Sequence, residues 1–226
     1  MNGFARKALA EFLGTALLVA TVVGSGIFVT GLTGDPALRL LTNALVTGAM
    51  LVALIVALGP VSAAFNPWVT LAERIFGAIR TGEAVGFAVA QTVGGIAGTV
   101  LANLMFSRPA IAISTHARTG SGRWLSEGLT TFGLLLVVFG VVRSGRRAHV
   151  GYAVGCYVTA SYFFAATGFS NAAVTIARMF SDTFAGIAPR SVPGFLVAQL
   201  IGTVAAVAAV RALYPQAREL AVELTR

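Results

Sequence analysis

The chain has 226 residues, of which 57% are hydrophobic and 11% charged, and its mean hydropathy is +0.85. Soluble domains are about 25% charged, and one core in a protein of this size could not bury so much apolar surface. These values exclude a soluble globular protein and indicate an integral protein of the lipid bilayer. The net charge of +8 comes mainly from arginines in short connections and near the ends, where they orient membrane spans. No basic stripe is interleaved with aromatic residues, so no nucleic acid is expected as a partner.

Six long apolar segments predict six membrane-spanning helices, at about 8–30, 38–58, 82–104, 124–142, 149–167 and 192–213. Their Leu, Val, Ala and Gly favour helices over the alternating strands of a membrane barrel. Six spans of about 20 residues use roughly 120 of the 226 residues and leave little room for a soluble domain. We therefore expect an all-α membrane protein with a single channel domain, 1–226. The arginine distribution favours both termini in the cytoplasm.

The two halves of the chain carry similar segments in the same order. The paired segments are 10–15 with 126–131, 66–72 with 171–177, and 86–91 with 194–199. Each half, about 1–106 and about 120–226, holds three spans. Because three is an odd number, the second half must lie in the opposite orientation, which predicts an inverted repeat.

Two connections, 59–82 and 168–192, are too long and apolar for ordinary loops and too short to cross the bilayer twice. In each, an asparagine starts a short helix, Asn66 at about 66–78 and Asn171 at about 171–182. Asparagine is a strong N-cap, and Pro67 suits the first helical position. About 12 residues of helix reach roughly 18 Å, a little over half of a hydrocarbon core of about 30 Å. The inverted repeat brings the two N-termini together near the midplane, where non-helical backbone implies a polar pathway.

The chemistry of this junction favours neutral solutes. Two helix N-termini place partial positive charge at the centre, and the amides of Asn66 and Asn171 can donate hydrogen bonds to a passing oxygen atom. Cations are repelled, and anions must lose their hydration. We expect a passive channel for small uncharged solutes, with an ion-coupled secondary transporter as the alternative. No motif indicates an enzyme, a cofactor or a metal site, and one cysteine, Cys156, excludes a disulfide framework.

These features resemble the aquaporin and aquaglyceroporin family, the major intrinsic proteins, over nearly the whole chain. The most specific segment is Phe65-Asn66-Pro67-x-Val69-Thr70-Leu71-Ala72. The resemblance implies six membrane helices, two re-entrant half-helices, a pore in each protomer and a homotetramer. It also implies that four buried polar residues support the re-entrant loops: Glu11, Glu127, Gln91 and Gln199. A proton relay is the alternative role for the two carboxylates.

Several positions depart from the family pattern. Trp68 replaces the usual alanine of the first asparagine box, and it either narrows the pore or packs against neighbouring helices. Ala172, followed by Ala173, replaces the usual proline of the second box. The family's water channels carry an arginine three residues after the second asparagine, where this chain has Val174.

By resemblance the selectivity filter consists of Val46, Thr159, Gly168 and Val174. Such a ring is wide, mostly apolar and uncharged, which leaves room for solutes larger than water. Alternatively, Arg178 or Arg190 supplies the missing charge, and Cys156 either faces the pathway or is an inert buried thiol.

The stretch 171–187 resembles the aquaglyceroporins found with bacterial arsenic-resistance genes. Arsenous acid is an uncharged trihydroxyl compound at neutral pH and is similar in shape to a small polyol. The sequence therefore predicts that metalloid hydroxides and methylated arsenicals cross the bacterial inner membrane, with glycerol-like polyols and some water. An orthodox water channel is the alternative.

Overall fold

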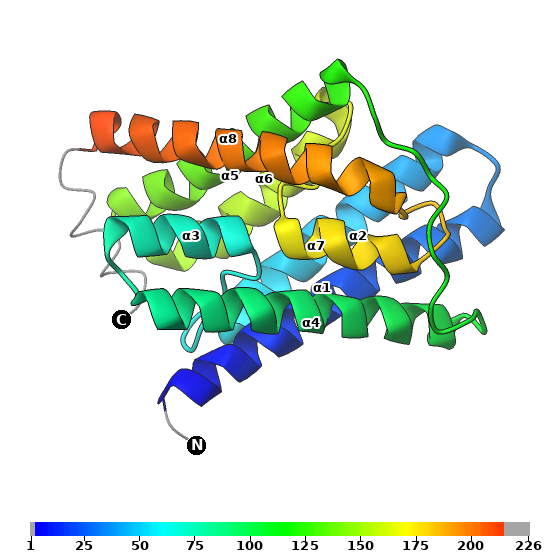
Figure 1. Ribbon diagram of the computed structural model, residues 1–226, viewed down its shortest axis with the longest axis horizontal. Coiled ribbons are helices and arrows are strands. Elements are labelled where there is room, and N and C mark those ends of the chain that lie inside the picture. The colour runs from blue at the N-terminus through cyan, green and yellow to red at the C-terminus, as the bar shows by residue number, and fades with distance from the viewer. Residues whose placement is uncertain (1–2, 215–226) are drawn as a thin grey trace.

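The computed structural model describes residues 3–214, which fold entirely into helices and connections without a strand. The six long helices are α1 (Gly3–Leu32), α2 (Pro36–Leu58), α4 (Thr81–Met105), α5 (Ser121–Arg143), α6 (Val150–Phe164) and α8 (Val192–Leu213). Two short helices, α3 (Pro67–Phe76) and α7 (Ala172–Ala177), lie between them (Figure 1). Residues 3–214 also contain three 3-10 turns: η1 (Arg147–His149), η2 (Arg178–Phe180) and η3 (Pro189–Ser191). The six expected spans and two short helices are therefore present.

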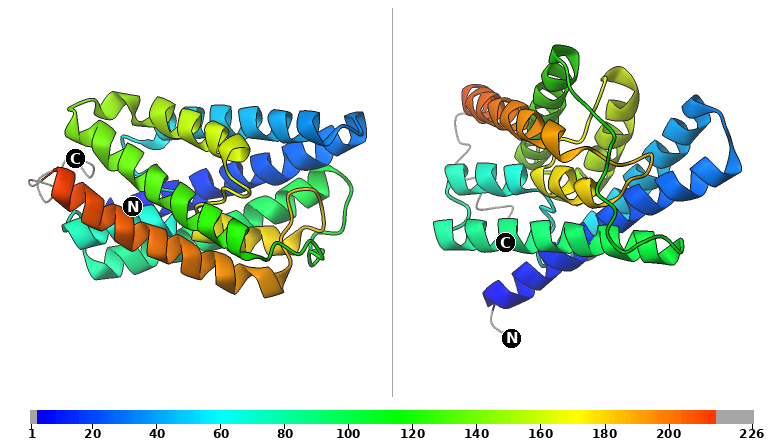
Figure 2. Two further views of the ribbon diagram at one scale, coloured as in Figure 1. Left: turned by 90° about the horizontal axis from the view of Figure 1, so that it is seen from above. Right: turned by 45° about the vertical axis from the view of Figure 1, so that its right-hand side comes forward.

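The packing of the long helices repeats between the two halves. Helix α1 packs along α4, α5 packs along α8, and α2 contacts α6; Figure 2 shows α5 and α8 side by side. The close approaches use glycine at equivalent places. A Cβ at Gly94 of α4 would overlap the carbonyl oxygen of Phe12 on α1, and a Cβ at Gly202 of α8 would overlap that of Gly128 on α5. The same helix contact is thus built twice, as the inverted repeat predicts.

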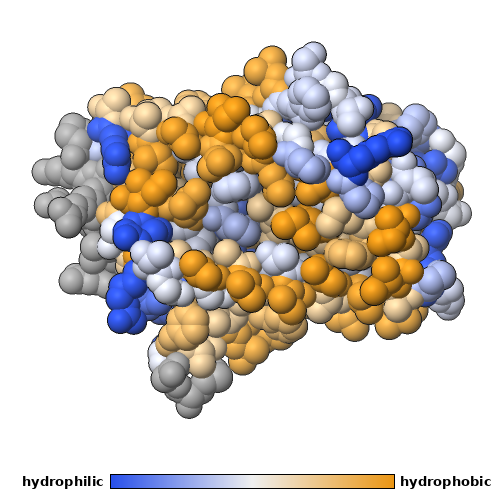
Figure 3. Space-filling model, viewed as in Figure 1, coloured by the Kyte–Doolittle hydropathy of each residue, from blue (hydrophilic) through white to orange (hydrophobic). Residues whose placement is uncertain are grey.

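The outer surface of the helix bundle is suited to a bilayer. Among residues 3–214, five segments are long and apolar enough to cross a membrane, and they contain α1, α2, α4, α5 and α8. Helix α6 has only 15 residues, although η1 directly precedes it. Figure 3 shows apolar residues across the middle of one face and hydrophilic residues gathered toward the ends of the long axis. This distribution places the long axis of the protein along the membrane normal.

The short helices α3 and α7 lie roughly end to end, with their N-termini toward each other at the centre (Figure 1). Helix α7 is shorter than the sequence predicts, because it changes to the 3-10 turn η2 after Ala177. Asn103 of α4 holds the end of that turn. Its Nδ2 donates to the backbone oxygen of Phe180 over 3.0 Å, and its Oδ1 accepts from the hydroxyl of Ser181 over 2.7 Å.

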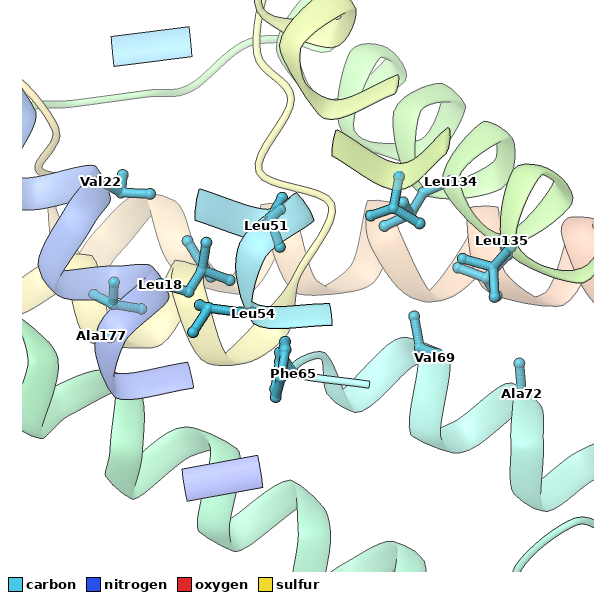
Figure 4. Packing of buried hydrophobic residues seen from close by; sticks show 14 of the residues in the cluster. Leu18, Val22, Leu51, Leu54, Phe65, Val69, Ala72, Leu134, Leu135 and Ala177 are labelled. Carbon is cyan, nitrogen blue, oxygen red and sulfur yellow. The ribbon is translucent and has the colours of Figure 1, made fainter. Parts of the chain in front are cut away.

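The apolar core surrounds the first half-helix. Figure 4 shows side chains of α1, α2 and α5, among them Leu18, Leu54 and Leu134, around Phe65 and Val69 at the start of α3. Residues from both halves of the chain contribute to this one cluster. The half-helix is therefore fixed in position by packing as well as by its polar contacts.

Candidate functional site

The two asparagines occupy the same conformation at the tips of the two half-helices. Asn66 has φ −154° and ψ 118°, and Asn171 has φ −154° and ψ 119°. Each side-chain oxygen caps its own helix, at 3.0 Å from the N atom of Trp68 and 3.2 Å from that of Val174. Both are N-caps, as the sequence predicts.

The asparagine amides also join the two halves. Nδ2 of Asn66 donates to the backbone oxygen of Ser170 over 2.7 Å, and Nδ2 of Asn171 donates to that of Phe65 over 2.7 Å. Each amide nitrogen carries a second hydrogen, and both asparagines line the central cavity. The site can therefore present two N–H donors to an oxygen atom in that cavity. The hydrogen bonds between the two halves fix the orientation of both donors.

The residue before each asparagine has a left-handed backbone, with φ 47° at Phe65 and φ 51° at Ser170. This conformation costs an L-residue roughly 1–2 kcal/mol, so the surroundings must fix it. The Phe65 ring packs on Gly14, where a Cβ would overlap it. The hydroxyl of Ser170 instead donates to Oγ1 of Thr130 over 2.7 Å. Gly14 and Thr130 occupy equivalent positions in the two halves. The same turn is therefore supported by ring packing in the first half and by a hydrogen bond in the second.

Two fully buried carboxylates hold these turns. Glu127 accepts from the backbone N atoms of Phe169 (2.8 Å) and Ser170 (3.0 Å) and from Nε2 of Gln199 (2.7 Å). In the first half, the donors to Glu11 are the backbone N atoms of Ala64 and Phe65, the Ser62 hydroxyl, and Nε2 of Gln91. Every carboxylate oxygen is therefore engaged by a re-entrant loop or a glutamine, as the resemblance leads one to expect.

Trp68 packs between the halves rather than narrowing the pathway. It lines none of the three cavities described below, and its Nε1 donates to Oε1 of Gln199 over 2.8 Å. The equivalent residue of α7 is Ala173, which has no side-chain donor. The corresponding oxygen, Oε1 of Gln91, is accordingly buried without a hydrogen bond from any residue of the described range.

Replacing Trp68 with phenylalanine should destabilise the protein by about 1–3 kcal/mol, because Oε1 of Gln199 then loses its donor in a buried site. The ratio of solute to water permeability should stay unchanged. Thermal unfolding in detergent micelles measures the first effect. Trp124→Phe is the matched control, since Trp124 is 42% exposed; equal shifts in the two variants would contradict the assigned role of the indole N–H.

Three cavities follow one another through the protein. The central one, of about 110 Å³, contains both asparagines. It shares Ala63, Ala64 and Glu73 with a cavity of about 450 Å³ at the end of the molecule where Lys7 lies. It shares Tyr162, Gly168 and Arg178 with a cavity of about 330 Å³ at the other end. The arrangement is a narrow pathway between two wider vestibules.

Two of the four expected filter residues line this pathway, and two do not. Gly168 and Val174 line the central cavity. Val46 is 39% exposed on the surface of α2, and Thr159 lies where α6 crosses α2 and donates to the backbone oxygen of Gly155 over 2.9 Å.

Val46 and Thr159 line none of the three cavities, because they lie on other faces of α2 and α6. One residue along a helix turns the side chain by about 100°, so a small counting error moves a residue to another face. The side chains that α2 and α6 present to the central cavity at its outer end are those of Thr47 and Tyr162.

Of the two alternatives for the outer constriction, an uncharged ring or a cation from Arg178 or Arg190, the position of Arg178 favours the second. Arg178 is only 6% exposed and lines both the central cavity and the vestibule beyond it. Its Nε donates to the backbone oxygen of Ala185, and its Cζ lies 3.6 Å from the centroid of the Phe169 ring. Arg178 thus supplies a cation one helical turn beyond Val174. Arg190 and Cys156 are exposed and line none of the three cavities.

The family model described as Major intrinsic protein matches residues 1–181. The chain belongs to the major intrinsic protein family. It is 48% identical over 217 residues to aquaglyceroporin AqpS of Rhizobium meliloti (strain 1021), covering 95% of this chain and 93% of that protein. It is 30% identical over 206 residues to probable aquaporin TIP2-2 of Oryza sativa subsp. japonica, covering 86% and 81%.

A solved structure supports the same fold. The X-ray structure of the aquaglyceroporin from Plasmodium falciparum aligns with a TM-score of 0.72 at 21% identity, covering 95% of this chain and 98% of that one. With the family membership, this identifies the chain as a multi-pass membrane channel for small solutes and not an enzyme.

Proposed function

We propose that this channel passively conducts metalloid hydroxides such as arsenous acid, methylated arsenicals and glycerol-like polyols, with some water. The observation that carries the proposal is the apolar side chain of Val174 in the narrow cavity, next to the amide donors of Asn66 and Asn171. We place the channel in a bacterial inner membrane with both termini in the cytoplasm. The family resemblance supports a homotetramer.

The wall of the central cavity suits a molecule with two kinds of surface. The asparagine amides meet hydroxyl oxygens, while Leu18, Val22 and Leu51 offer an apolar side. A polyol presents C–H groups to such a side, and a methylated arsenical presents its methyl groups. A solute of this kind exchanges water for protein contacts on both faces, so its desolvation is partly compensated.

A water channel is the second candidate, and the position of Arg178 favours it. A buried guanidinium at the outer end of a cavity of about 110 Å³ narrows the pathway and adds hydrogen-bond donors there. Under that reading, polyhydroxyl solutes would be excluded by size.

Stopped-flow light scattering on proteoliposomes distinguishes the two candidates. Vesicles with purified protein should take up glycerol and arsenous acid at least about tenfold faster than protein-free vesicles, the change produced by lowering a barrier by 1.4 kcal/mol. Urea is the comparison solute, and uncouplers should have no effect because the flux is passive. Fast water flux without glycerol or arsenous acid uptake would overturn the proposal in favour of a water channel.

A further inference from the structure

The two half-helices present equivalent side chains to the pathway, and the last pair consists of a carboxyl group and a guanidinium group. From α3 these are Asn66, Val69 and Glu73; from α7 and its continuation η2 they are Asn171, Val174 and Arg178. Both sets have the spacing i, i+3, i+7, which places the three side chains on one helix face. Seven residues of helix cover about 10 Å, so each of these two groups lies roughly that far from its asparagine.

Glu73 stands where the central cavity opens into the wider vestibule, and it lines both. Its side chain is partly buried. Among residues 3–214, its carboxyl group makes no hydrogen bond or ion pair, and it borders both cavities. Lys7 of α1 and Arg147 of η1 line the same vestibule. Glu11, the other carboxylate near Glu73, is fully engaged by the loop.

We propose that Glu73 is a solute-binding residue that selects for molecules with two or more hydroxyl groups. The inference rests on the proposed function, because it names the group that such solutes meet between the vestibule and the narrow cavity.

The reason is the balance of donors and acceptors along the pathway. Asn66, Asn171 and Arg178 offer N–H donors, which suit the oxygen atoms of a hydroxyl group. The hydrogen atoms of the same hydroxyls need acceptors, and a carboxyl group offers two oxygens for them. Two hydroxyls on one solute can donate to both oxygens at once. Glu73 thus replaces water molecules around the solute where the solute loses its hydration shell, between the vestibule and the central cavity.

The test compares glycerol, arsenous acid and water permeability of proteoliposomes that carry equal amounts of wild-type protein, Glu73→Leu, Glu73→Gln or Glu73→Asp. Loss of the hydrogen bonds to the two Glu73 oxygens predicts that Glu73→Leu lowers both solute permeabilities by about tenfold relative to water. Glu73→Gln keeps one acceptor, so its solute-to-water permeability ratio should lie between those of Glu73→Leu and wild type. The ratio of Glu73→Asp should stay near that of wild type. Glu83→Gln is the control, because Glu83 caps α4 and bonds to Arg80 outside all three cavities.

The outcomes distinguish a failure of the proposed function from a failure of the inference about Glu73. If wild-type vesicles conduct water but neither solute, the proposed function is wrong and the inference fails with it. If wild-type vesicles conduct both solutes and Glu73→Leu leaves the solute-to-water ratio unchanged, the proposed function stands and the inference is overturned. An equal loss of water and solute permeability in both Glu73→Leu and Glu73→Gln also overturns it, since Glu73 would then only maintain the shape of the pathway.

Discussion

Replacing Glu127 with alanine should prevent most of the protein from folding. Three donors lose their acceptor at once: the partly buried backbone N atom of Phe169, and the buried N atom of Ser170 and Nε2 of Gln199. Each buried donor left without a partner costs about 1–3 kcal/mol, and proteins are stable by only about 5–15 kcal/mol. The measurement is the yield of monodisperse protein in detergent and its melting temperature.

Asp182→Ala is the matched control for this prediction. Asp182 also accepts a backbone N–H, from Thr115 over 2.9 Å, but at an exposed site. Water can replace an exposed acceptor, so this variant should melt close to wild type. A Glu127→Ala variant that melts like Asp182→Ala would show that the second re-entrant loop does not depend on its buried carboxylate.

The local features of the pathway could be predicted from sequence because they depend on neighbouring residues. Asparagine caps a helix through its own backbone neighbours, and Pro67 fixes the first turn. Residues 66–78 were therefore expected as a half-helix, and α3 covers Pro67–Phe76. The orientation of the two half-helices followed from the odd number of spans in each half, which the repeated segments revealed.

The contents of the filter could not be predicted in the same way, because they depend on how separate helices rotate and cross. Thr159 was expected in the pathway, yet its hydroxyl lies against Gly48 at the crossing of α6 and α2. Tyr162, one turn further along α6, lines the pathway instead. The sequence of α6 alone does not distinguish the face that carries Thr159 from the face that carries Tyr162, because the helix is apolar on nearly all sides.

The sequence already offers Arg178 as an alternative source of the missing charge, and Glu73 could have been matched with it. Glu73 and Arg178 stand seven residues after Asn66 and Asn171, and a helix places positions i, i+3 and i+7 on one face. The repeat thus extends one turn beyond Val69 and Val174, to Glu73 in the first half and Arg178 in the second.

Introducing an arginine at Val174 should close the channel to solutes. Val174 is 6% exposed and lines the central cavity, so a guanidinium there would occupy the narrow space itself. Arg178 follows four residues later on the same face, and like charges at that spacing repel each other. We expect Val174→Arg to lower glycerol and arsenous acid permeability by at least about tenfold and water permeability by less, because water passes a narrower, charged constriction more readily.

Val174→Leu separates the effect of charge from that of volume. Leucine adds one methylene group to the wall and leaves the site apolar, so solute permeability should fall by less than in Val174→Arg. Both variants are measured by stopped-flow light scattering with equal amounts of channel in each vesicle preparation. Solute uptake by Val174→Arg at the wild-type rate would mean that the side chain at 174 does not limit the pathway. The apolar wall beside the asparagine donors would then not be the source of the selectivity.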